Sequence, residues 1–163
     1  MRIVWTIMVL VLLVGSGWVV MHAHTRRADQ QQMEQRTIGA IRAIQSEIKV
    51  IAGTEGAELN GRGWPVTIDP AWFEGQTPAN AMLKGARPWL EVAAPDQADL
   101  MHPVVRQAVD RSTPAFWYNP GNGVVRARVP VMISDKAAIE AYNRINGSTI
   151  TSLVDVSPER AKR

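Results

Sequence analysis

The sequence has no cysteine among its 163 residues. Disulfide bonds, thiolate nucleophiles and cysteine-ligated metal sites are therefore excluded. Its three histidines, His22, His24 and His102, form neither an HxxxH nor an HExxH array, so no zinc site is expected. The sequence also lacks a GxSxG nucleophile elbow, a GxxxxGK[ST] phosphate loop and a GxGxxG turn. We therefore expect neither an enzyme nor a cofactor-binding protein.

A basic stripe is missing as well. The net charge is +3 and the pI is near 9.7, yet the basic residues do not alternate with aromatic ones along any segment. No nucleic-acid partner is therefore expected. The densest charge run lies in residues 157–163, which we expect to be a disordered basic tail.

Charge is also absent from residues 3–21, a run that would cover roughly 28 Å as a helix, about the thickness of the hydrocarbon core of a bilayer. Tryptophans stand near both of its ends, where indole rings favour the headgroup level, and two glycines allow close helix approach. We expect residues 1–27 to form a membrane anchor with a polar collar. The residues that define this span are Ile3, Trp5, Gly15, Gly17, Trp18 and Met21.

A cleavable signal peptide is the main alternative for this segment. Its apolar region is normally about 7–15 residues long and ends at a small-x-small site. The run here is longer, and Met21-His22-Ala23 places a bulky residue where a small one is needed. We favour an uncleaved single-pass anchor. The basic residues on the two sides nearly balance, so charge does not decide the orientation.

Residues 28–55 are expected to continue as an amphipathic stalk helix that ends at Gly53. An apolar seam with spacings of three and four runs along one face of this helix. The seam could pack on a partner helix, as in a coiled coil, or on the protein's own sheet; its short length favours the sheet. The packing residues, which follow Thr37, are Ile41, Ile44, Ile48 and Ile51.

Residues 56–156 are expected to form a small α+β head. The pattern predicts strands over 65–68, 88–94 and 149–156, and helices over 101–111 and 135–146, the second helix being closed by Gly147.

The sharpest local pattern is a hairpin within residues 115–129 (AFWYNPGNGVVRARV). Two β-rich runs flank an Asn-Pro-Gly-Asn-Gly turn. Alternation in the second strand places Val125, Ala127 and Val129 on one face and two arginines on a wet face. We expect the hairpin and the loops over 60–85 to be exposed and to face partners. The hairpin residues are Phe116, Trp117, Tyr118, Asn119, Pro120, Gly123, Arg126 and Arg128.

This layout resembles the type IV pilin and type II secretion pseudopilin family. The resemblance is carried by the two-part N-terminal helix, by the small head that follows it, and by residues 116–120 (FWYNP) and 123–127 (GVVRA), which are similar to the "YNP…G.VRA" hairpin of many such heads. It implies an α+β pilin-like fold in which the long helix packs on a small antiparallel sheet. It also implies a structural role among other protein subunits of a secretion or pilus-like system. The head would then be periplasmic, on the outer side of the cytoplasmic membrane.

Two family features are missing. The sequence opens MRIVW, without the Gly-Phe or Gly-Met processing site of prepilins and without a Glu in the apolar run. The resemblance therefore implies a divergent member that is neither processed nor polymerised, or a start that is shifted.

Two other hypotheses concern ligands. A membrane-anchored extracytoplasmic binding module would need at least two of the head tryptophans exposed in one concave patch. These tryptophans are Trp64, Trp72, Trp89 and Trp117, and we expect them in the core. Asp96 and Asp99, near Glu91, could offer carboxylates to Ca²⁺, but they lack EF-hand spacing, and an ordinary solvated turn is expected.

Overall fold

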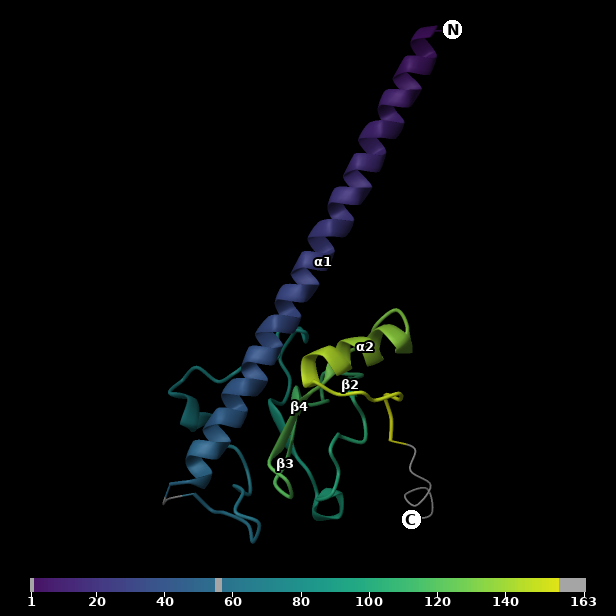
Figure 1. Cartoon of the computed structure of the whole chain (residues 1–163). Coiled ribbons are helices and arrows are strands. Elements are labelled where there is room, and N and C mark those ends of the chain that lie inside the picture. The colour runs from purple at the N-terminus through teal and green to yellow at the C-terminus, as the bar shows by residue number, and fades with distance from the viewer. Residues whose placement is uncertain (1, 55–56, 156–163) are drawn as a thin grey trace. The chain divides into compact units, whose positions relative to one another are not determined.

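The computed structural model describes the backbone of residues 2–54 and 57–155, and the side chains from residue 27 onward within these ranges. The chain has an α+β fold with a long N-terminal helix and a small mixed sheet (Figure 1). The elements are α1 (Arg2–Ala52), η1 (Pro70–Phe73), β1 (Leu90–Val92), η2 (Pro95–Gln97), β2 (Gln107–Ala108), β3 (Phe116–Asn119), β4 (Val124–Ala127), β5 (Val129–Pro130) and α2 (Asp135–Asn146).

Helix α1 is continuous over 51 residues, and the expected stop at Gly53 is present. The chain divides into two compact units, residues 1–33 and 34–163. Among the residues whose side chains are described, no helix is both long enough and apolar enough to cross a membrane. The expected span, residues 3–21, lies outside those residues, and its backbone forms part of α1. The tail over 157–163 also lies outside the described residues.

The C-terminal half of α1 is part of the core of the head. Along one face, Thr37, Ile41, Ile44 and Ile48 are buried, and Ile51 is half-buried. The Thr37 hydroxyl donates to Asn80 Oδ1 at 3.3 Å, which ties the helix to a loop of the head. The spacing of the buried positions is that of one helical face, so this apolar stripe lies on the protein's own head.

The main sheet has the order β1-β3-β4 and is mixed. β3 and β4 form the expected antiparallel hairpin, with Phe116 opposite Ala127. β1 instead runs parallel to β3, with Leu90 opposite Phe116. The expectation of a wholly antiparallel sheet is therefore wrong. The chain between Val92 and Phe116 is long enough to cross over, which a parallel pair requires.

Several shorter predictions are corrected. Residues 101–111 form no helix, because the backbone around Val105 pairs with Val154 and the chain then enters β2, which is parallel to β5. His102 precedes Pro103, which disfavours a helical conformation for His102. The strand expected over 149–156 is reduced to the bridge at Val154, and the one expected over 65–68 to a bridge between Leu59 and Pro65. The strand over 88–94 is shortened to β1.

Helix α2 has the predicted bounds. The Ser134 hydroxyl accepts from the Ala137 N–H at its start, and Gly147 ends it in the left-handed conformation. Its buried residues are Ala138, Ala141, Tyr142, Ile145 and Asn146, and the helix packs against β4 and β5.

Candidate functional site

The β3–β4 hairpin is the central element of the head. All of β3, from Phe116 to Asn119, is buried, and it is the central strand of the sheet, with β1 paired along one edge and β4 along the other. The Tyr118 hydroxyl donates to the Pro65 carbonyl at 2.8 Å. Burial raises the pKa of Tyr118, so its hydroxyl keeps its proton and acts as a donor. The strands of the hairpin are therefore structural, and the expectation that the hairpin is exposed is wrong for them.

Asn119 joins the hairpin to the loop after β1. Its Nδ2 donates to the carbonyl oxygens of Gln97, Ala98 and Leu100 at 2.9, 3.1 and 2.8 Å. Its Oδ1 accepts from the Gly121 N–H at 2.8 Å. One buried amide thus closes the turn and fixes the neighbouring η2 segment.

Two positions of the turn leave no room for a side chain and therefore require glycine. A Cβ at Gly121 would lie 2.4 Å from the Ala98 carbonyl oxygen. Gly123 has a φ of +71°, and a Cβ there would lie 2.7 Å from the ring of Trp64. The sequence pattern identified Gly123 by its turn chemistry, whereas the close approach at Gly121 is a tertiary feature.

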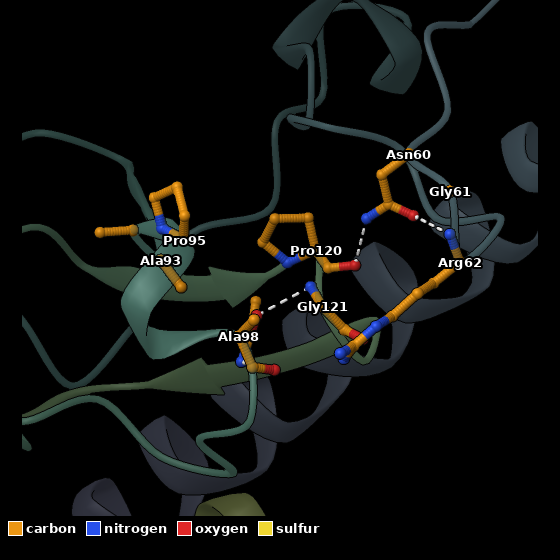
Figure 2. A pocket seen from close by; sticks show the side chains of 10 residues that line it. Asn60, Gly61, Arg62, Ala93, Pro95, Ala98, Pro120 and Gly121 are labelled. Carbon is orange, nitrogen blue, oxygen red and sulfur yellow. Dashed lines mark hydrogen bonds between the residues drawn. The ribbon is translucent and has the colours of Figure 1, made fainter.

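Residues 60–64 hold the turn from the opposite side. Asn60 Nδ2 donates to the Pro120 carbonyl at 2.6 Å, and Arg62 Nη1 donates to the Gly121 carbonyl at 2.8 Å. Figure 2 shows Pro120 and Gly121 between these two residues and Ala98. An open hollow of about 360 Å³ lies here, and Arg62 is the only charged residue among those that line it. The hairpin tip is thus a half-buried junction that could receive a small apolar group.

The structure corrects the expected wet face of the second strand. Arg128 is only 2% exposed, and its Nη2 pairs with Glu91 at 2.6 Å. Its Nε and Nη1 donate to the carbonyls of Val105 and Pro114 at 3.0 and 3.1 Å. A buried guanidinium is tolerated here because a carboxylate and two carbonyls satisfy it.

Arg126 is half-buried beside this pair. Its Nε donates to the Met101 carbonyl at 3.0 Å, and its Nη1 donates to the Asn146 carbonyl at 3.3 Å. Burial lowers the pKa of Arg126. Both arginines of the hairpin therefore connect the sheet to surrounding loops and helices.

His102 and Tyr142 meet next to these arginines. His102 Nδ1 lies 3.1 Å from the Tyr142 hydroxyl, and the two rings pack edge to face. Burial, with added repulsion from Arg126 and Arg106, lowers the pKa of His102 to about 4. The imidazole is therefore neutral at neutral pH.

A charged pair fastens α1 to α2. Arg144 donates from Nε and Nη2 to the two carboxylate oxygens of Glu34, at 2.9 and 2.7 Å. This two-point geometry gives a strong, directional contact, and the hydrogen bond to Glu34 is the main cause that raises the pKa of Arg144. The partner lies 110 positions away in the sequence, so sequence spacing could not have revealed this pair.

Two buried asparagines were also missed by sequence reasoning. Asn80 Nδ2 donates to the carbonyls of Ala115 and Arg128 at 3.1 and 2.8 Å. Asn146 accepts from the Ala127 N–H at 2.8 Å and donates to the Ala127 carbonyl at 3.0 Å, so it occupies the free edge of β4 as a strand would. Nothing local in the sequence marks either residue as buried.

The tryptophans expected in the core are divided between two environments. Trp117 is fully buried, and Trp64, Trp72 and Trp89 are half-buried. Trp89 packs edge to face on both Phe73 and Phe116. Neither the hollow at the hairpin tip nor the second hollow, beside residues 149–155, is lined by tryptophan.

The acidic residues considered for Ca²⁺ are separated by their contacts. Glu91 pairs with Arg128, whereas exposed Asp99 lies 3.5 Å from Arg62. Within the described residues, no group of three His, Cys, Asp or Glu side chains is placed to hold a metal ion.

Comparison of the chain with protein-family models, curated proteins and solved structures finds no match.

Proposed function

We propose that the protein is a membrane-anchored structural subunit with a pilin-like layout, and that it serves in an assembly of the type II secretion or type IV pilus kind. In this proposal, residues 3–21 hold the chain in the cytoplasmic membrane and the head lies on the outer side. The protein is then a scaffold or assembly component rather than an enzyme, and its partners are the membrane and other protein subunits.

The observation that carries the proposal is that α1 contributes both to the core of the head and to the expected membrane span. Its C-terminal half supplies buried residues such as Ile44 and Ile48 to the core of the head. The same helix contains the uncharged run over 3–21. A helix that supplies core residues at one end and has an uncharged run of roughly 28 Å at the other suits a membrane anchor that continues into the head.

The contacts of the head support a structural role. The hairpin, the η2 loop and residues 60–64 are joined by buried or half-buried asparagine side chains, and Arg128 is neutralised by Glu91. These polar side chains are used to connect elements to one another. The tryptophan contacts described above do not favour the alternative binding module, which needs an exposed aromatic patch.

The anchor is tested by placing charge in the middle of the run. Val11→Arg combined with Leu13→Arg should cost on the order of 5–7 kcal/mol of insertion free energy. Wild-type protein in native membranes should resist alkaline carbonate extraction, and the double variant should be lost from the membrane fraction. Gln31→Arg combined with Gln35→Arg is the matched control, since it adds the same charge at exposed positions outside the run.

Equal retention of the double variant, or extraction of the wild-type protein by carbonate, would contradict the anchor. The assembly role is tested in the same membranes by chemical cross-linking. Discrete cross-linked species containing the protein should form with the wild type and the control, and should be lost with the double variant. A protein that stays wholly monomeric in intact membranes would argue against the assembly role.

A further inference from the structure

A second hollow, of about 390 Å³, lies between Arg106 and residues 149–155. The backbone N–H of Arg106 donates to the Leu153 carbonyl at 3.0 Å, which holds this segment beside the start of β2. The residues that line it include Thr149, Thr151 and Asp155. The hollow is open to solvent, and its volume falls within the range of small-ligand sites.

Arg106 is the unusual member of this wall. The residue is only 8% exposed, yet it forms no salt bridge within the described part of the chain. Its Nη1 donates to the Ser152 carbonyl at 2.9 Å, while its Nε is buried without any hydrogen-bond partner. A buried guanidinium normally has a carboxylate or phosphate opposite its planar fork of donors.

Nearby Arg128 shows the usual solution. It is even more deeply buried, at 2% exposure, but Glu91 lies 2.6 Å away and balances its charge. The Arg106 guanidinium has an N–H donor without a partner and a charge without a salt bridge among the described residues. A buried cation without a counter-charge is costly. The contrast between the two residues indicates that the Arg106 guanidinium has capacity to bind an anionic ligand.

Two further arginines act on the same neighbouring groups as Arg106. Arg126 and Arg106 both act to lower the pKa of His102, and Arg126, Arg106 and Arg128 all act to lower the pKa of Tyr142 against the effect of burial. Asp155 also lines the hollow and contributes a negative charge to its wall. An anion is therefore expected to bind against the guanidinium, with modest affinity.

We propose that this hollow is a binding site for an oxyanion, a carboxylate or a phosphate group, held by the guanidinium of Arg106 with the hydroxyls of Thr149 and Thr151 as further donors. Both ligand groups present adjacent oxygens that match two N–H donors of the fork. The site is separate from the hollow at the hairpin tip and does not depend on the proposed assembly role.

The test uses the full-length protein in non-ionic detergent and NMR titration with inorganic phosphate, with sodium acetate in parallel. Ionic strength is held constant with sodium chloride. Saturable shifts of the amide signals of residues 149–153 and of the Arg106 Nε–H signal are expected. A response to phosphate alone identifies a phosphate-type ligand, and a response to acetate as well identifies a carboxylate. Either response supports the site.

Substitutions test whether the anion binds at Arg106. Arg106→Gln should weaken anion binding about tenfold or more, because a charged hydrogen-bonding partner is lost. Arg106→Lys should weaken it less, since the charge stays and the fork is lost. Exposed Arg111→Gln is the matched control for charge and should bind as the wild type does.

The proposal is overturned if phosphate and acetate cause only the non-saturating shifts that chloride causes. It is also overturned if Arg111→Gln weakens binding as much as Arg106→Gln does. Should Arg106→Gln fail to fold, the wild-type titration and Arg106→Lys still decide, because saturation and a reduced affinity in the lysine variant can be measured without it.

Discussion

Replacing Ile44 by alanine should destabilise the head strongly, because Ile44 is fully buried on the face of α1 that packs into the core. The substitution removes three buried carbons, and at about 0.8 kcal/mol for each the loss of apolar burial is about 2.4 kcal/mol. The cavity left behind adds to this loss, so a total of about 2–5 kcal/mol is expected. Ile44→Val removes one carbon and should cost about 0.5–1.5 kcal/mol.

The assay is equilibrium chemical unfolding of the full-length protein in detergent, followed by tryptophan fluorescence. Val50→Ala is the matched control on the same helix, since Val50 is 54% exposed and should change the free energy of unfolding by less than about 0.5 kcal/mol. Refutation would be an Ile44→Ala variant as stable as Val50→Ala. A midpoint that rises with protein concentration would instead indicate that the seam packs on a partner helix.

Three further predictions concern the head. Gly121→Ala should lower the free energy of unfolding by about 1–3 kcal/mol, because the new Cβ would overlap the Ala98 carbonyl, whereas Gly61→Ala meets open space; equal effects in denaturant unfolding would be inconsistent with the packed turn. Asn146→Ala should cost about 1–3 kcal/mol and speed amide exchange at Ala127, whose N–H loses its acceptor; unchanged exchange there would refute the edge-capping role. The pKa of His102 is lowered from 6.5 to about 4 in the folded protein. Because the unfolded chain therefore binds the proton at a higher pH, the free energy of unfolding should fall as the pH drops from 6.5 towards 4. Below about pH 4 the contribution of His102 should level off. His102→Asn should remove this contribution to the dependence of stability on pH. An NMR titration that gives His102 a pKa near 6.5 would show that burial does not lower its pKa.

The elements that could be predicted from the sequence are those specified by neighbouring residues. The hairpin follows from β-rich runs around residues 119–123, and α2 follows from Ser134 before it and Gly147 after it. The end of α1 follows from Gly53. In each case the chemistry of a turn or cap acts within a few positions, so pattern reasoning is sufficient.

The elements that were missed depend on contacts that are distant in sequence. Residues 101–111 carry apolar spacing typical of a helix, but pairing of Val105 with Val154 takes their backbone into extended structure. Alternation placed Arg128 on a wet face because the sequence gives no sign that Glu91 lies opposite it. The parallel β1–β3 pair and the caps made by Asn80 and Asn146 likewise arise from tertiary packing, which overrides local pattern.

The proposal that residues 3–21 remain joined to the head as an anchor is tested most directly by the intact mass and N-terminal sequence of the protein isolated from membranes of its native host. We expect a mature chain that begins at Met1 or Arg2 and is recovered in the membrane fraction. A chain that begins near Ala23 would show that a signal peptide had been removed, and it would contradict the anchored, pilin-like subunit proposed for this protein.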